Sequence, residues 1–225
     1  MNRIGPELVP AWARPTPGEH RWPAALAVAV AIGLQLLVPA RMVPDARFVL
    51  PALELAVLIG LMVVNPFRVD RESTILRTGS LGLTGLVALA NGWSVVLLVV
   101  ELLTGQPATP GELLGAGGAI WLNNVIVFGL VYWELDRGGP AARAAALDDR
   151  PDFLFPQMQI PEIAGRDWEP RYVDYAYLSF TNATAFSPTD VLPLSRWAKL
   201  TMAVQAGVSL VVVVLVVARA INALS

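Results

Sequence analysis

The chain has 225 residues, of which 55% are hydrophobic and only 15% are charged, and its mean hydropathy is +0.57. A soluble domain carries roughly 25% charged residues, so this composition indicates a membrane protein. The net charge of -2 argues against a nucleic-acid-binding protein. The absence of cysteine excludes disulfides and thiolate chemistry, and the single histidine, His20, lies outside every apolar run.

The sequence predicts an all-α fold, a polytopic transmembrane helix bundle with five spanning helices. Residues 1–22 are polar and proline-rich, so we expect a short disordered tail. A spanning helix needs about 20 mostly apolar residues. Runs of this kind cover residues 23–43, 48–66, 80–104, 113–135 and 197–224, and the first four form the region 23–135. A signal peptide is the alternative interpretation of the first run, because arginines precede it and "VPA" resembles a cleavage site.

Two further segments lie between the fourth run and the last one. Residues 136–171 are predicted to form a polar loop whose apolar "FLFPQM" suits the bilayer surface, and Glu134 and Asp136 beside it are expected to be solvated. In the final region, 172–225, a short helix precedes the last span. Residues 172–190 are too few and too polar for an ordinary crossing, so we expect a re-entrant or interfacial helix. A true crossing would give six spans.

The distribution of basic residues predicts the orientation. The N-terminal tail, the loop after the second run, the long loop and the start of the last run hold most of the arginines, whereas the opposite side has only Arg41, Arg47 and Arg219. The positive-inside rule then places the N-terminus in the cytoplasm. The arginine-rich, alanine-rich and proline-rich composition is typical of a bacterial protein from a GC-rich genome. We therefore expect a multi-pass protein of the bacterial inner (plasma) membrane.

The C-terminal quarter, "YLSFTNATAFSPTDVLPLSRWAKLTMAVQAGVSLVVVVLVVARAINAL", contains a pore-like pattern. It resembles the pore helix, filter loop and inner helix of the two-transmembrane module of bacterial potassium channels. The matching residues are Tyr177, Ser179, Phe180, Asp190, Pro193, Ser195 and Arg196. Gly207 falls at the place of the family's hinge glycine. The whole chain is similar to uncharacterised bacterial multi-pass membrane proteins that share this C-terminus.

The filter itself departs from the family pattern. Where the family has Thr-Val-Gly-Tyr-Gly, residues 185–189 read "AFSPT". A potassium filter lines its pore with successive backbone carbonyls, and its glycines permit the required backbone angles. Pro188 fixes its own φ and restricts Ser187, so potassium-selective geometry is not encoded. The charge distribution also places this loop inside, whereas the family's filter faces outside. An inverted pore loop, as in ionotropic glutamate receptors, would reconcile the two.

Two sets of polar residues are candidates for a site. The pore and loop candidates are Thr181, Asn182, Thr184, Ser187, Thr189 and Asp190. They could line a vestibule, or they could serve as helix caps and turn residues. The intramembrane candidates are Glu54, Asn91, Asn123, Asn124 and Gln205. Ionisable groups such as Glu54 and Glu101 are functional candidates by default in apolar runs, whereas amides commonly bond helices to one another.

Three functions remain open from the sequence. No catalytic constellation, cofactor motif or metal-ligand spacing is present, so an enzyme is not expected. The first hypothesis is a channel-like homo-tetramer in the lipid bilayer that conducts a monovalent cation without potassium-type selectivity. The second is a non-conducting scaffold or accessory protein that keeps the pore-like hairpin as a packing element. The third is a small-solute transporter that uses Glu54 and the amides.

Overall fold

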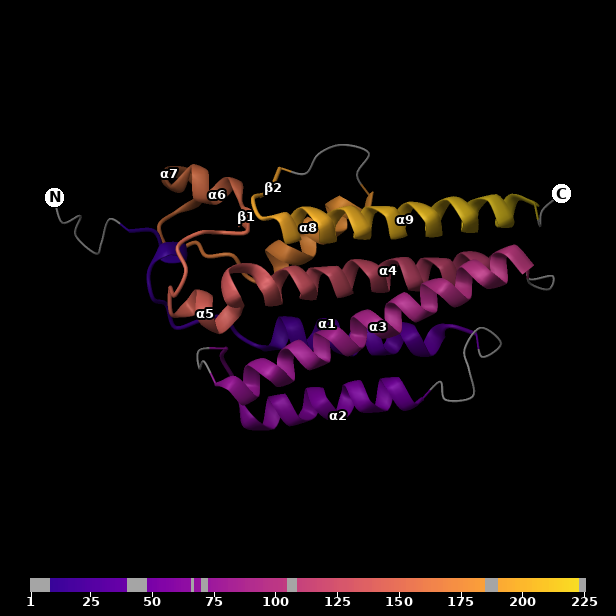
Figure 1. Cartoon of the computed structure of the whole chain (residues 1–225), viewed down its shortest axis with the longest axis horizontal. Coiled ribbons are helices and arrows are strands. Elements are labelled where there is room, and N and C mark those ends of the chain that lie inside the picture. The colour runs from indigo at the N-terminus through magenta and orange to yellow at the C-terminus, as the bar shows by residue number, and fades with distance from the viewer. Residues whose placement is uncertain are drawn as a thin grey trace.

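The computed structural model describes residues 9–39, 48–65, 67–69, 73–104, 109–184 and 190–222. The regular secondary structure of this part of the chain is helical apart from one pair of two-residue strands. The long helices lie side by side along the molecule, and the short elements gather at one end (Figure 1). The long helices are α1 (Trp22–Leu37), α2 (Val49–Val64), α3 (Thr74–Thr104), α4 (Pro110–Leu135) and α9 (Arg196–Asn222).

Three of these helices, α3, α4 and α9, are long and apolar enough to cross a membrane within the part of the chain that the structure describes. Helices α1 and α2 are also apolar, but each has 16 residues. A helix of that length is about 24 Å long, which is less than the roughly 30 Å of a bilayer's hydrocarbon core. The membrane-protein character predicted from composition is therefore supported by three helices.

Helix α4 is the centre of the bundle, because it packs against α1, α3, α8 (Tyr172–Thr184) and α9. Its start is fixed by a capping box: the Thr109 hydroxyl accepts from Glu112 N, and the Glu112 carboxylate accepts from Thr109 N. Pro110 occupies the first turn, where its missing N–H costs nothing. Close packing along α4 depends on two glycines, Gly117 against Val216 of α9 and Gly129 against α8.

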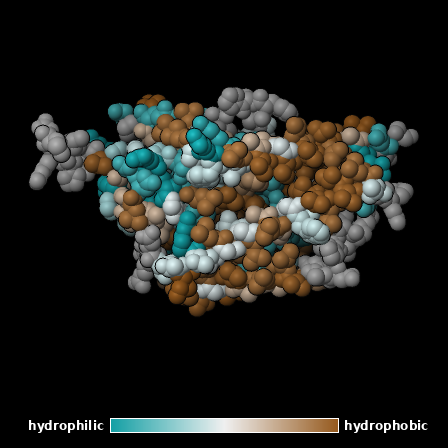
Figure 2. All heavy atoms as spheres, in the orientation of Figure 1, coloured by the Kyte–Doolittle hydropathy of each residue, from teal (hydrophilic) through white to brown (hydrophobic). Residues whose placement is uncertain are grey.

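The short elements form a cap, which we define as residues 9–21, 136–171 and 190–195. The cap contains η2 (Ala11–Ala13), η4 (Asp136–Gly138), α5 (Pro140–Ala144), β1 (Phe153–Leu154), α6 (Pro156–Gln159), α7 (Pro161–Ala164) and β2 (Leu192–Pro193). Strands β1 and β2 are antiparallel, with Phe153 opposite Pro193. Hydrophilic atoms gather over the cap, whereas hydrophobic atoms cover most of the bundle (Figure 2).

The cap is folded, whereas the sequence predicts a disordered tail and a polar loop for its residues. Within the predicted tail 1–22, residues 1–8 lie outside the described part, but residues 9–21 are folded. Ala11 N donates to Arg166 O, and His20 forms a β-bridge with Arg68. In the predicted loop 136–171, Phe153 is completely buried among aromatic rings. Proline and glycine here terminate short elements that pack, rather than leaving the segment irregular.

Helix α8 lies between α4 and α9, and both ends of its segment are tied to the cap. At its start Tyr172 N donates to Glu19, and after it Leu194 N donates to Asp152 O. Tyr175 and Leu178 are fully buried against the bundle. The opposite face of α8, with Val173, Tyr177 and Phe180, is exposed and predominantly apolar.

The apolar core has two parts along the bundle. The larger part lies near the cap and includes Val28, Leu130, Tyr132 and Phe153. The second part lies at the far end and consists of Val38, Leu98, Leu102, Leu113, Ala116, Ile120, Val212 and Val216. Because these side chains come from α3, α4, α9 and the residue after α1, they close the far end of the bundle with hydrocarbon.

Candidate functional site

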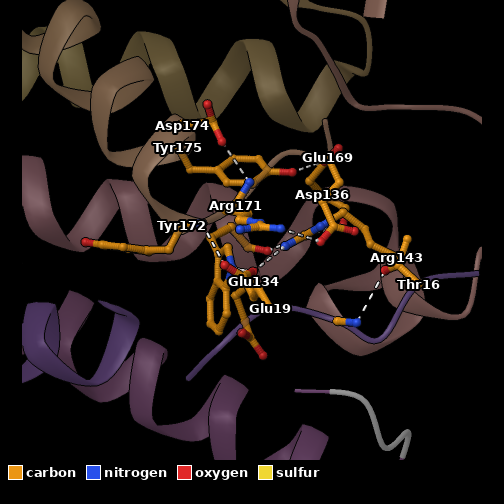
Figure 3. A network of polar contacts seen from close by, with 12 residues as sticks. Thr16, Glu19, Glu134, Asp136, Arg143, Glu169, Arg171, Tyr172, Asp174 and Tyr175 are labelled. Carbon is orange, nitrogen blue, oxygen red and sulfur yellow. Dashed lines mark hydrogen bonds and ion pairs between the residues drawn. The ribbon is translucent and has the colours of Figure 1, made fainter. Parts of the chain in front are cut away.

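A buried arginine, Arg143 of α5, organises the junction between the cap and the bundle (Figure 3). Its Nη1 donates to the carbonyl oxygens of Trp133 (2.7 Å) and Asp136 (2.9 Å). Its Nη2 lies 3.7 Å from Glu19 Oε1, and its guanidinium carbon lies 5.0 Å from the centre of the Tyr175 ring. One side chain therefore joins the segment before α1, the end of α4, α5 and α8.

Two buried carboxylates surround this arginine. Glu19 accepts hydrogen bonds from Trp133 Nε1 and from Tyr172 N at 2.9 Å. Asp136 accepts from Tyr175 OH at 2.5 Å and from Asp152 N at 2.9 Å. Burial raises the pKa of the Glu19 carboxyl, and the Arg143 charge only partly opposes this effect. Buried charges are tolerated when they are paired and hydrogen-bonded, so the whole arrangement depends on Arg143.

A third carboxylate, Glu134, is also buried, and the prediction that Glu134 and Asp136 are solvated is wrong. Glu134 is 1% exposed and Asp136 is 0% exposed. Glu134 Oε1 accepts from Arg77 Nη1 at 2.8 Å, which ties α4 to α3. A Cβ at Gly139 would lie 2.1 Å from that same nitrogen, so glycine is required for Arg77 to reach Glu134. The sequence predicts solvent exposure for these carboxylates because the segment that covers them, 136–171, has the proline and glycine content of a loop.

Arg137, in the turn directly after α4, has a left-handed backbone conformation with φ 52° and ψ 35°. Only glycine, and sometimes asparagine or aspartate, adopts this left-handed conformation readily. The conformation is held by three bonds: Arg137 N donates to Asp152, Nε donates to Asp148 O, and Nη1 donates to Trp12 O. Asp152 also accepts from Trp197 Nε1 of α9 at 2.9 Å. The turn after α4 thus fastens the cap to the first turn of α9.

Deeper in the bundle, Gln205 of α9 joins three helices. Its Oε1 accepts from Tyr132 OH at 2.6 Å and from Asn182 Nδ2 at 2.8 Å. Its Nε2 donates to the carbonyl and the hydroxyl of Ser179, at 2.9 and 2.6 Å. We call Tyr132, Ser179, Asn182 and Gln205 the Gln205 cluster. The amide of Gln205 uses both its acceptor and its donor, so α8 is bonded to α4 and α9 of the same chain.

A second polar cluster, the asparagine cluster, joins α3, α4 and α9. Asn91 Nδ2 donates to Asn124 Oδ1, and Asn123 Nδ2 donates to Asn91 Oδ1, each at 3.1 Å. Asn124 Nδ2 donates to Ser209 Oγ at 3.0 Å. All four residues are buried. Four of the five intramembrane candidates, Asn91, Asn123, Asn124 and Gln205, are therefore bonded to other helices of the bundle.

The fifth intramembrane candidate, Glu54, lies apart from these clusters. It is fully buried on α2, and both carboxylate oxygens accept from Gln35 Nε2 of α1, at 3.3 and 3.0 Å. This contact joins the two short apolar helices. No amide of the other clusters is bonded to Glu54 in the described part of the chain, so the structure does not gather Glu54 and the amides into one site.

The pore and loop candidates that the structure describes are Thr181, Asn182, Thr184 and Asp190, and they do not gather into one polar cluster. Thr181 and Thr184 bond to carbonyl oxygens of their own helix, at Tyr177 and Phe180. Asp190 is exposed beside the cap. Ser187 and Thr189 lie outside the described residues. Asn182 is the candidate of this set that reaches another helix, since it bonds to Gln205 and to Met202 O.

Gly207, the predicted hinge, lies on the exposed side of α9, which is one continuous helix. No atom lies within 4 Å of a Cβ placed there. Gly207 borders a largely apolar hollow of about 410 Å³ beside the end of α8, together with Trp121, Asn182 and Ser209. The residue therefore shapes a surface of the bundle and does not mark a bend in this conformation.

In the described residues, no group of three or more metal-ligating side chains of the His, Cys, Asp or Glu type is close enough to hold a metal ion. We define Glu19, Glu134, Asp136 and Arg143 as the cap cluster. Sequence reasoning missed it because its bonds join residues that are far apart in the chain: Glu19 bonds to residues 114 and 153 positions away. One signal was present: Arg143 lies within a run of small and apolar residues, "GGPAARAAAL".

No family model matches the chain, and no curated protein or solved structure matches it.

Proposed function

We propose that the chain is a non-conducting membrane protein that presents the folded cap on one face of the bilayer as a scaffold or accessory surface. The hairpin that resembles a pore module acts as a packing element. The single observation that carries this proposal is the Gln205 cluster, in which the polar groups of α8 are bonded within one chain.

The proposed topology has five crossings and one re-entrant hairpin. Helices α1, α2, α3, α4 and α9 would cross, with α1 and α2 supported by local bilayer thinning or tilt of the others. Residues 172–190 would enter from the cap side and return to it, since Tyr172 N donates to Glu19, and Leu194 N, shortly after this segment, donates to Asp152 O of the cap. The basic residues favour a cytoplasmic cap and N-terminus in a bacterial inner membrane.

Two further observations support a closed protein. The far end of the bundle is filled by buried hydrocarbon, including Leu98, Ile120 and Val212, which offers no ligand to an ion. The outward faces of α8 and α9, which would line an axis shared by four copies, carry Phe180, Val204 and Leu210 among other apolar residues. An ion crossing such a surface would lose its hydration without replacement.

The rival function is a channel-like tetramer conducting a monovalent cation. One observation supports it: Tyr172 at the start of α8 bonds to Glu19 of the cap, and Leu194 before α9 bonds to Asp152 of the cap. The test is to reconstitute the purified protein into liposomes and measure potassium and sodium flux. The proposal predicts flux equal to that of protein-free liposomes at every protein density tested.

The control for this test is a known channel reconstituted at the same density, which shows that the assay detects conduction. A protein-dependent flux that changes with Asn182→Ala would overturn the proposal in favour of the channel. A flux of a small organic solute without ion flux would instead support the transporter hypothesis.

A further inference from the structure

A hollow opens on the side of the bundle where α8 ends. Helix α8 stops at Thr184, whereas α4 and α9, which pack against each other, continue toward the far end (Figure 1). The hollow has a volume of about 410 Å³, within the roughly 300–1,000 Å³ of ordinary ligand pockets. Its wall consists of Trp121 of α4, the last three residues of α8, and residues between Ala206 and Val213 of α9. The space arises because α8 covers only part of the length of its two neighbours.

Small residues of α9 keep the hollow open. Gly207 is exposed, and a Cβ placed there would have no atom within 4 Å. Ala206 beside it contributes only a methyl group. Leu210 and Val213 line the hollow and yet remain 52% and 45% exposed. The hollow therefore opens to the surroundings of the bundle, and these two side chains form its rim.

The polar side chains in the wall offer little to a charged or polar ligand. The Asn182 amide donates to two oxygens of α9, Thr184 Oγ1 donates to a carbonyl of its own helix, and Ser209 Oγ accepts from an amide of α4. The Trp121 indole nitrogen has no partner, but it is buried and so is not part of the surface of the hollow. None of the described residues that line the hollow is charged. Because a polar ligand would lose its hydration without replacement, the wall suits an apolar occupant.

The position of the hollow indicates what this occupant is. Helices α4 and α9 are two of the helices able to cross a membrane, and Leu210 lies near the middle of α9. Lipid chains surround a spanning helix at this level, and an empty hollow would forfeit their dispersion contacts. Close packing of a neighbouring helix needs small residues at the contact, but the rim carries Leu210 and Val213. A single hydrocarbon chain is narrow enough to pass between these side chains.

We propose that the hollow is a binding site for the hydrocarbon chain of a membrane lipid. The chain fills the space beyond α8 and packs against the Trp121 ring, Gly207 and the last turn of α8. It thereby supports the end of the hairpin against α4 and α9. This inference rests on the proposed topology, because the hollow lies in the bilayer only if α4 and α9 cross it. It does not depend on whether the protein conducts ions.

The test uses the full chain in nanodiscs that contain a phosphatidylcholine with a photoactivatable diazirine in the middle of one acyl chain. After irradiation, the adducts are located by mass spectrometry of peptides. The proposal predicts at least about threefold more adduct on Leu210 than on Leu89, the effect of several additional dispersion contacts. Leu89 is the matched position, since it is 74% exposed on α3 and lies 15 residues after Thr74, as Leu210 lies 14 residues after Arg196.

Variants at two exposed glycines test whether the hollow itself holds the chain. Gly207→Leu fills the hollow and should lower the adduct on Leu210 to the level on Leu89, and Gly207→Ala should lower it less. Gly118→Leu is the matched control, because a Cβ at Gly118 also has no atom within 4 Å but does not line the hollow. It should leave both yields unchanged.

Four outcomes would overturn the proposal. Equal adduct on Leu210 and Leu89 would mean that the hollow holds lipid no better than an open helix face. An excess on Leu210 that survives Gly207→Leu would place the bound chain elsewhere. Adduct on Leu89 without adduct on Leu210 would mean that protein covers the hollow, from a second copy or a partner. Adduct on neither residue would contradict the proposed topology as well.

Discussion

The two ends of the bundle are built by different chemistry. The end beside the cap carries buried ion pairs and amides, from Glu19 and Arg143 to Gln205. The far end is hydrocarbon, where Gly117 lets Val216 approach α4. Contacts between hydrocarbon side chains are non-directional, whereas hydrogen bonds require defined distances and angles. The difference indicates that the cap end determines how the elements are placed and the far end closes the bundle.

The largest expected effect comes from removing the positive charge of Arg143, which pairs with the buried carboxylates beneath the cap. Arg143→Met would leave Glu19 and Asp136 buried without their main counter-charge, which costs about 3–5 kcal/mol for a broken buried pair. We expect a large loss of thermal stability in detergent, measured by the unfolding midpoint. Arg150→Met, at an exposed arginine of the same cap, is the control and should change little. An Arg143→Met protein as stable as the parent would mean that the cluster does not hold the cap.

The next effect concerns the far end. Gly117→Ala places a methyl group 2.5 Å from a Val216 methyl, so overpacking should cost up to about 3 kcal/mol. In the same assay, the double variant Gly117→Ala/Val216→Ala should regain much of the stability that Gly117→Ala alone loses, because the smaller side chain removes the clash. Gly118→Ala, one position along α4 with no atom within 4 Å of the new Cβ, is the control and should be neutral or stabilising. Equal effects of the two alanines would rule out the close contact.

A smaller effect is expected from the Gln205 cluster. Gln205→Leu would leave the Tyr132 hydroxyl without its acceptor and would leave the Asn182 amide with Met202 O alone, at a cost of about 2 kcal/mol. Proteolysis of the α8 segment should become faster in this variant, because the hairpin loses its bonds to α9. Val204→Leu, at an exposed neighbouring position, is the matched control. Unchanged proteolysis in Gln205→Leu would show that apolar packing alone holds α8.

The smallest effect is expected from the asparagine cluster. Hydrogen bonds between helices in membranes contribute about 0.6 kcal/mol on average. A double-mutant cycle with Asn91→Ala and Asn124→Ala should therefore give a coupling energy of this order in reversible unfolding. A coupling near zero would mean that water or lipid replaces the contact, and that these asparagines do not select the pairing of α3 with α4.

Much of the helical framework was predictable from the sequence, because apolar runs and caps are local signals. The capping residues Thr109 and Glu112 and the proline between them mark the start of α4 directly. The polar residues Asn91 and Gln205 could be recognised as candidates, since amides in apolar runs need partners. Their partners could not be assigned, because the bonds join helices whose relative rotation no local pattern specifies.

The cap could not be predicted for a related reason. Its bonds connect Glu19 with Trp133 and Tyr172, which are distant in sequence. Prolines and glycines in residues 136–171 look like loop signals, although Gly139 serves a packing role beside Arg77. Burial of Asp136 follows only once Arg143 is placed beside it. Charged residues at the end of a helix read as solvated unless the covering segment is known.

The absence of cysteine allows a direct test of the central claim, that the polar groups of the hairpin are bonded within one chain. Asn182→Cys and Gln205→Cys would be combined in one protein, treated in membranes with a short bifunctional thiol reagent and compared with the single Asn182→Cys variant treated in the same way. The account predicts a cross-link within single chains for the pair and no cross-linked dimers for the single variant. Dimers of the single Asn182→Cys variant, formed across an axis shared by several copies, would contradict it.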